Sequence, residues 1–243
     1  MLVLFTDFGL SGPYTGQITA VLKQLAPEVP IISLFADAPS SQPKPAAYLL
    51  AAYGTWFPDG TVLLCVVDPG VGSARRAVIV EAGGRIYVGP DNGLFDIIMR
   101  RDPDAQLWEI GWRPQPLSAS FHGRDLFAPV AARLAAGEPI ANVARRTVDE
   151  SATRGWPDDL AQIVYIDHYG NAMTGMRGAL LSPEARLIAR GHELTSAATF
   201  SAVPQGQAFW YVNSNGLAEI AVNGARADTA LGLAIGSPVS VED

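Results

Sequence analysis

Apolar residues in the first half of the chain fall into short runs separated by stretches with helical spacing. Leu2 to Phe5 is an unbroken apolar run, typical of a buried strand. The apolar residues between positions 18 and 25 recur at i, i+3, i+4 and i+7, as they do on one face of a helix. The alternation continues with strands expected at 30–35 and 61–67 and a helix at 44–56. Strands that alternate with helices predict an α/β domain with a mostly parallel sheet.

Two further elements extend this predicted domain. Residues 77–81 and 85–88 flank Gly83-Gly84, which predicts a β-hairpin added to the sheet. A helix is expected from about Asp125 to Ala136, with Gly137 as a suitable C-terminal stop.

The pattern changes after Arg145. Residues 147–159 are polar, contain Gly and Pro and show no sustained period, so we interpret them as a linker. Short strand-like runs separated by turn residues then predict a small β-barrel or sandwich. The chain is thus expected to hold an α/β domain over residues 1–150 and a smaller, barrel-like all-β domain over residues 158–243. The runs in the second domain are Gln162–Ile166, Arg186–Ala189, Ala208–Asn213, Leu217–Val222 and Ser237–Val241.

Composition narrows the class of protein. Of the 243 residues, 49% are hydrophobic and 17% charged, which favours a folded protein over a disordered one. The net charge of −7 and the lack of a basic stripe argue against nucleic-acid binding. A single cysteine, Cys65, excludes a disulfide within the chain and a cysteine-rich metal site. No apolar run reaches the roughly 18 residues of a membrane span and no leader pattern opens the chain, so a cytoplasmic protein is expected.

Polar clusters follow the first and third predicted strands, where ligands usually bind in open α/β sheets. Asp7, in Thr6-Asp7-Phe8-Gly9, can accept hydrogen bonds from ligand hydroxyls, or it can cap the next helix. Asp68 and Arg75 stand at the two ends of a loop that contains Gly70 and Gly72. They can form a functional pair or a structural salt bridge that closes the loop.

Two more clusters have the same double interpretation. His122, next to Gly123 and before a predicted helix, can be a functional imidazole or a histidine bonded to backbone at the helix start. Asp167 and Asn171, where a strand of the second domain ends, can bind a ligand or form an ordinary Asx turn.

Common catalytic motifs are missing. The sequence has no H-E-x-x-H metal motif, no G-x-S-x-G nucleophile elbow and no phosphate-binding G-x-x-x-x-G-K loop. We therefore expect no metal and no bound cofactor.

The order and spacing of the clusters resemble those of the S-adenosylmethionine hydroxide adenosyltransferases, relatives of the fluorinase and chlorinase enzymes. The resemblance runs over nearly the whole chain. It is carried by Thr6-Asp7-Phe8-Gly9, Asp68-Pro69-Gly70-Val71-Gly72 with Arg75, Gly89-Pro90-Asp91-Asn92-Gly93, Phe121-His122-Gly123-Arg124-Asp125, Ile166-Asp167-His168-Tyr169-Gly170-Asn171, and Asn213-Ser214 followed by Asn223-Gly224.

The resemblance implies hydrolysis of S-adenosylmethionine to adenosine and L-methionine. It also implies a homotrimer whose active sites lie between the first domain of one subunit and the second domain of a neighbour. Its catalytic set falls on Asp68, Arg75 and His122. The implied substrate contacts are Asp7 for the ribose hydroxyls, Asp167 and Asn171 with Ser214 for the amino-acid end, Tyr169 and Phe200 as aromatic contacts, and the backbone near Gly224 for the adenine edge.

The sequence departs from the family pattern around Pro13-Tyr14-Thr15-Gly16, where an acidic residue and a valine are usual, and around 36–40, where Ser40 or a neighbour replaces an aromatic ring. Three alternatives to hydrolysis stay open. They are a halide-dependent synthase of 5′-halo-5′-deoxyadenosine, a binding protein for adenosine or S-adenosylmethionine without turnover, and a metal-dependent phosphatase.

Overall fold

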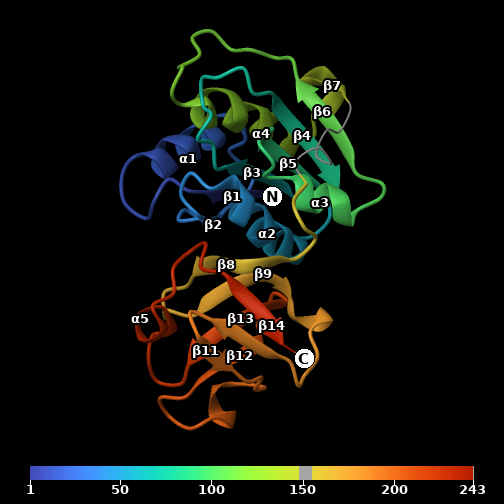
Figure 1. Ribbon diagram of the computed structural model, residues 1–243. Coiled ribbons are helices and arrows are strands. Elements are labelled where there is room, and N and C mark those ends of the chain that lie inside the picture. Colours follow the sequence, from blue (N-terminus) through green and yellow to red (C-terminus); the bar gives the residue numbers. More distant parts are fainter. Residues whose placement is uncertain (148–154, 243) are drawn as a thin grey trace. The chain divides into compact units, whose positions relative to one another are not determined.

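The computed structural model describes residues 1–147 and 155–242, and these residues divide into two compact units (Figure 1). Unit 1 spans Met1–Gly155 and unit 2 spans Trp156–Asp243. Most of the expected linker, residues 148–154, lies outside the described residues. Each unit is described by itself below.

Unit 1 is built on a seven-stranded sheet with strand order β2-β1-β3-β5-β4-β6-β7. The β2-β1-β3-β5 part is parallel, whereas β5-β4-β6-β7 is antiparallel, so the sheet is mixed. The strands are β1 (Leu2–Thr6), β2 (Ile31–Phe35), β3 (Val62–Val66), β4 (Ala77–Ala82), β5 (Arg85–Pro90), β6 (Gln106–Ile110) and β7 (Ala144–Arg146).

Helices cover both faces of the parallel part. Leu2 and Leu4 of β1 belong to a buried cluster with residues of α1 (Tyr14–Leu25) and α4 (Ala128–Ala135). Side chains alternate along a strand, and Phe5 points to the opposite face, where its ring contacts Phe35. Phe35 in turn contacts Tyr53, the last residue of α2 (Pro43–Tyr53). Burial on both faces explains why β1 and β3 are continuous apolar runs.

The structure confirms the hairpin and adjusts the bounds of two predicted helices. Strands β4 and β5 pair antiparallel around Gly83-Gly84, both with positive φ. The helix predicted at 44–56 ends at Tyr53 and continues as a 3₁₀ turn, Gly54–Trp56. The helix predicted from Asp125 begins with a π-helical turn, Gly123–Phe127, followed by α4. Among the α-helices and strands described in unit 1, three were not predicted, because they are short and have no clear period: α3 (Asp96–Arg101), β6 and β7.

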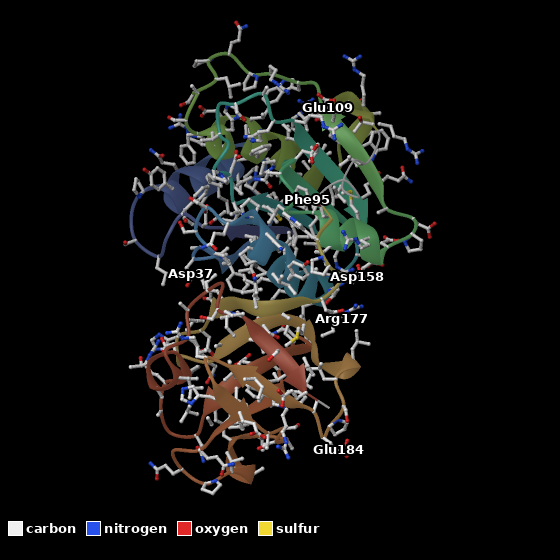
Figure 2. The ribbon with its side chains drawn as sticks, viewed as in Figure 1. Asp37, Phe95, Glu109, Asp158, Arg177 and Glu184 are labelled. Atoms are coloured by element: carbon white, nitrogen blue, oxygen red, sulfur yellow. The ribbon has the colours of Figure 1, made fainter. Side chains whose placement is uncertain are left out.

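Unit 2 consists mainly of two antiparallel sheets, with strand orders β12-β13-β9-β8 and β11-β10-β14. Trp210 lies in its core with its indole N–H donating to the Ala185 carbonyl at 2.9 Å. Side chains of both units are drawn in Figure 2, where Phe95 lies inside unit 1 and Glu184 at the margin of unit 2. The elements are β8 (Leu160–Ile166), β9 (Ala172–Arg177), β10 (Arg186–Ala189), β11 (His192–Leu194), β12 (Ala208–Val212), β13 (Leu217–Val222), α5 (Ala227–Leu231) and β14 (Val239–Glu242), with 3₁₀ turns at Ile140–Asn142 of unit 1 and Gly178–Leu180 and Phe200–Ala202 of unit 2.

In the part of the chain that the structure describes, every helix is too short or too polar to cross a bilayer.

Candidate functional site

Two carboxylates of unit 1 lie at the same edge of its sheet. Strands β1 and β3 are parallel neighbours with Thr6 opposite Val66, so their carboxyl ends coincide. The Asp7 N–H donates to the Val66 carbonyl at 3.3 Å, and Asp68 lies two residues after Val66 in the chain. The strand-end positions that sequence alone suggested therefore bring Asp7 and Asp68 together, as expected in an α/β sheet.

Asp68 and Arg75 form a fork-shaped ion pair. Arg75 Nε donates to Asp68 Oδ1 at 2.8 Å and to Oδ2 at 3.0 Å, and Nη2 also donates to Oδ2. Only 4% of the Asp68 side chain and 10% of the Arg75 side chain is exposed. A buried, bidentate pair has a well-defined geometry, so both groups are held in fixed positions.

The loop between them needs glycine at position 72. Gly72 has φ +80°, and a Cβ there would lie 2.5 Å from the Ala119 carbonyl oxygen. Only glycine avoids both the strained conformation and the collision. The loop can therefore lie against the segment that leads to His122.

His122 completes a continuous set of three side chains. Its Nδ1 lies 3.1 Å from Arg75 Nη2. A guanidinium has only donors, so Nδ1 is the acceptor and the neutral imidazole carries its proton on Nε2. Burial lowers the pKa of His122, and the neighbouring charge of Arg75 lowers it further. The imidazole is thus kept neutral, with Nε2–H as a donor.

Asp68 and His122 line a small cavity of about 90 Å³. Asp7 lies on its wall, and the Ser41 N–H donates to Asp7 Oδ2 at 2.8 Å. Ser41 adopts φ +57°, a left-handed conformation that is uncommon for serine. Burial raises the pKa of Asp7, and the charge of Asp68 adds to that effect. The lining residues are Asp7, Phe8, Ser41, Val66, Asp68, Val71, Ser120, Phe121, His122 and Gly123.

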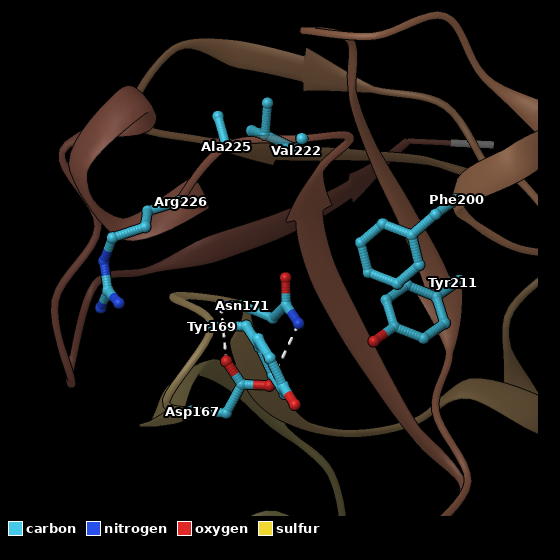
Figure 3. Close-up of a pocket in the computed structure, with 9 residues that line it drawn as sticks. Asp167, Tyr169, Asn171, Phe200, Tyr211, Val222, Ala225 and Arg226 are labelled. Atoms are coloured by element: carbon cyan, nitrogen blue, oxygen red, sulfur yellow. Dashed lines mark hydrogen bonds between the residues drawn. The ribbon is translucent and has the colours of Figure 1, made fainter.

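Unit 2 contains a larger cavity, of about 660 Å³ (Figure 3). Aromatic rings and polar groups share its wall, a combination typical of small-molecule sites. Its lining residues are Asp167, Tyr169, Asn171, Phe200, Tyr211, Val222, Gly224, Ala225 and Arg226.

Asp167 orients Asn171 in this cavity. The Asn171 N–H donates to Asp167 Oδ1 at 2.8 Å and its Nδ2 donates to Oδ2 at 3.0 Å. These bonds link residues four positions apart, unlike an Asx turn, in which the side chain bonds the backbone two residues on. They also leave the Asn171 amide oxygen directed away from Asp167 (Figure 3). The turn therefore presents a hydrogen-bond acceptor to a ligand.

Tyr211 is held by a buried carboxylate behind the cavity. Its hydroxyl donates to Glu219 Oε1 at 2.5 Å, and Asn213 Nδ2 donates to Oε2 at 2.7 Å. Burial raises the pKa of Glu219, and the charge of Asp167 adds to it. The Tyr211 ring meets that of Phe200, with centroids 5.5 Å apart. Two rings and a fixed hydroxyl thus form one wall.

Most of the site residues predicted from sequence lie at these two cavities. Asp7, Asp68 and His122 line the first, and Arg75 touches two of them. Asp167, Tyr169, Asn171, Phe200 and Gly224 line the second. Ser214 is outside that lining; it lies in the turn after β12 and accepts a hydrogen bond from Asn215 Nδ2 at 3.3 Å.

Sequence reasoning missed Ser41, Tyr211 and Arg226. Tyr211 had a usable signal, because period-two alternation puts it on the face of β12 opposite the core residue Trp210. Ser41 contacts Asp7 through its backbone, and Arg226 is oriented by Asp228 and the His168 carbonyl. Neither leaves a pattern in the sequence. Among the described residues, no three His, Cys, Asp or Glu side chains gather to hold a metal ion.

Comparison with known proteins identifies the family. The model of the SAM hydroxide adenosyltransferase N-terminal domain matches residues 2–144, and that of the C-terminal domain matches residues 161–240. The (R)-S-adenosyl-L-methionine hydrolase of Thermus thermophilus is 38% identical over 252 residues, 96% of each chain. The fluorinase of Nocardia brasiliensis is 22% identical, over all of this chain and 96% of its own. The crystal structure of an uncharacterized conserved protein from Thermotoga maritima aligns over all of both chains with a TM-score of 0.88 and 28% identity. The chain therefore belongs to the SAM hydroxide adenosyltransferase family.

Proposed function

We propose that this protein hydrolyses S-adenosylmethionine to adenosine and L-methionine by in-line attack of water on the ribose 5′ carbon. The observation that carries the proposal is the continuous set of Asp68, Arg75 and His122 at the edge of a small cavity. The relative from Thermus thermophilus, named as a hydrolase of this substrate and similar over 96% of both chains, supports it.

The reaction needs alignment and an activated water. The sulfonium leaves as a neutral thioether, so no acid is required for the leaving group. Well-oriented reactants can lower such a barrier by about 7–11 kcal/mol. The remaining requirement is to hold a water molecule behind the carbon–sulfur bond and to accept its proton.

We assign these tasks within the set. His122 donates through Nε2–H to the water oxygen and fixes its position. Arg75 stabilises the hydroxide character that develops on that oxygen. Asp68 is the proton acceptor, because Arg75 is a permanent donor and His122 has its acceptor nitrogen occupied. The same carboxylate repels a halide ion, which favours water as the nucleophile.

The cavity of unit 2 is proposed to bind most of the substrate. Its volume of about 660 Å³ is typical of pockets that enclose a small molecule, roughly 300–1,000 Å³, whereas the 90 Å³ of the first cavity is too small. Phe200, Tyr211 and Tyr169 offer rings for contact with the nucleoside. Asn171 offers an acceptor for a substrate N–H, and Asp167 a carboxylate beside it.

The proposed assembly is a homotrimer in which unit 1 of one subunit and unit 2 of a neighbour share each substrate molecule. In this proposal Asp7 holds the ribose hydroxyls, the backbone near Gly224 meets the adenine edge, and Ser214 adds to the pocket for the amino-acid end. Tyr169, with 74% of its surface exposed, is available for such a shared site.

The two sheets of unit 2 are further proposed to form one barrel. Two isolated bridges support this closure: Gln162 of β8 pairs with Pro238, just before β14, and Ser196, just after β11, pairs with Trp210 of β12. A closed barrel would leave no open sheet edge for unwanted pairing.

Turnover of S-adenosylmethionine in ¹⁸O-water tests the proposed function. Label in the adenosine 5′-hydroxyl is the expected result. Incubation with fluoride or chloride tests the halide alternative, which would yield a halogenated nucleoside. Calorimetry that shows adenosine binding, with no release of methionine, would instead indicate a binding protein. Loss of activity on addition of chelators would indicate a metal-dependent phosphatase.

A further inference from the structure

The motif Gly89-Pro90-Asp91-Asn92-Gly93 has no part in the proposed chemistry, yet it contacts both ends of the loop that carries Asp68 and Arg75. Asn92 Nδ2 donates to the Val67 carbonyl at 2.8 Å, directly before Asp68. Asn92 Oδ1 accepts the Leu94 N–H at 3.3 Å. The amide orientation is therefore fixed by both of its ends.

The second contact is made by the preceding residue. Arg76 Nε donates to Asp91 Oδ2 at 2.7 Å, and Arg76 Nη2 lies 2.6 Å from the same oxygen in an ion pair. The Asp91 N–H donates to the Arg76 carbonyl at 3.1 Å. Arg76 directly follows Arg75 in the chain. Asp91 thus contacts the other end of the same loop by both side chain and backbone.

Sheet topology explains why the motif can reach both ends. The strand order is β3-β5-β4, so the loop from β3 to β4 must cross the end of β5. The motif includes the last two residues of β5 and continues directly beyond it. At Gly89, a Cβ would collide with the Cys65 carbonyl oxygen, so glycine lets β5 approach β3 closely.

We propose that Asp91 and Asn92 are positioning residues that hold residues 67 and 76 and thereby set the geometry of Asp68 and Arg75. The loop between these ends contains two short turns, Asp68 to Val71 and Gly70 to Ser73, and no regular element. Fixing both ends keeps the Arg75 guanidinium within reach of His122. Because a misplacement of about 1 Å can cost about 10²-fold in rate, the positions of these ends matter for turnover.

The test uses two isosteric variants of the full-length protein. Asn92→Asp keeps the acceptor for Leu94 but replaces the donor to Val67 with an anionic oxygen. Asp91→Asn removes the charge that pairs with Arg76. The matched control is Glu138→Gln, which breaks a similar ion pair with Arg133 at 2.6 Å elsewhere in unit 1.

Two readouts are combined for each variant. The first is kcat and KM with S-adenosylmethionine, which rests on the proposed function. The second is ¹⁵N NMR of the His122 ring, whose Nδ1 signal reports the hydrogen bond from Arg75. The chain has three histidines, so His168→Gln and His192→Gln assign the spectrum. The NMR measurement still tests the positioning role of Asp91 and Asn92 if the protein turns over no substrate.

The expected result for both variants is a fall in kcat of about tenfold or more, a smaller change in KM and a shifted His122 Nδ1 signal. Glu138→Gln should leave kcat and the signal unchanged. Wild-type kcat with a wild-type His122 signal in folded Asn92→Asp and Asp91→Asn would overturn the proposal. If Asp91→Asn does not fold, Arg76→Gln breaks the same pair from the other side, and the same two outcomes apply.

Discussion

Arg75 Nη2 lies 3.1 Å from His122 Nδ1, and this contact requires an imidazole with a bare Nδ1. Protonation of His122 would place an N–H against the guanidinium and break the contact. The pKa of His122 is lowered by burial and then by the charge of Arg75. The pH range in which the set of three is intact therefore extends below the ordinary histidine pKa of 6.5.

The first prediction concerns the pH profile of turnover. As pH falls, kcat should decline when His122 takes up a proton, with a midpoint below 6.5 because the pKa of His122 is lowered. A profile of kcat from pH 4 to 9 checks this. The His122→Gln variant, which does not titrate there, should lack this acidic decline. A wild-type midpoint above 6.5 would contradict the assignment.

The second prediction tests whether His122 acts as a hydrogen-bond donor to the water or as a base. Loss of the imidazole donor in His122→Ala should lower kcat by about 10²–10³-fold. A glutamine side chain ends in an amide that can donate a hydrogen bond but cannot accept a proton from water. His122→Gln should therefore recover part of the lost rate. Equal rates for the two variants, measured with saturating substrate, would favour a base at this position instead.

The third prediction concerns Asp68. Asp68→Ala should lower turnover by about tenfold or more while the substrate still binds, because the proposed pocket in unit 2 is unchanged. The variant should also unfold more easily, by about 3–5 kcal/mol, since Arg75 is left buried without its partner. Calorimetric titration with S-adenosylmethionine and urea unfolding measure the two effects. Unchanged turnover would remove Asp68 from the proposed set.

Part of the unit 1 cluster could be anticipated from sequence, because two of its residues follow strand ends. Asp7 and Asp68 could be placed together from the alternation of strands and helices alone. Arg75 and His122 could not, since the contact between them depends on how the 68–75 loop lies against residue 119. Glu219 was read only as part of a strand, because a carboxylate buried against Tyr211 and Asn213 looks the same in sequence as one facing water.

The fourth prediction concerns Glu219 and stability. Its pKa is raised in the folded state by burial and by Asp167, so the folded protein binds this proton more tightly than the unfolded chain. Its contribution to stability is thus full below the ordinary glutamate pKa of 4.5 and is lost as pH rises through the folded value.

Glu219→Gln should remove this part of the pH dependence, because the amide cannot ionise yet still reaches Tyr211 and Asn213. Free energies of unfolding measured from pH 4 to 7 test it. The wild type should lose stability relative to the variant as pH rises. Parallel curves for the two proteins would show that Glu219 does not titrate in this range.

The fifth prediction concerns Gly72. Gly72→Ala forces an L side chain into φ +80° and against the Ala119 carbonyl, so the loop must move and kcat should fall. Gly137→Ala is the matched control, because Gly137 has φ +92° but open space around it. Both should lose about 1–3 kcal/mol of stability from backbone strain. Only Gly72→Ala should lose turnover, and equal kcat values in the two variants would argue against a requirement for this loop position.

The bond from Ser41 to Asp7 is made by main chain, and it has a consequence for how this family is compared. Any residue that tolerates φ near +57° can supply the same N–H, and glycine, asparagine and aspartate do so most readily. Selection can therefore act on the backbone at position 41 while the side chain drifts. A ranking of positions by residue conservation would miss position 41, although its N–H orients Asp7 in the proposed substrate site.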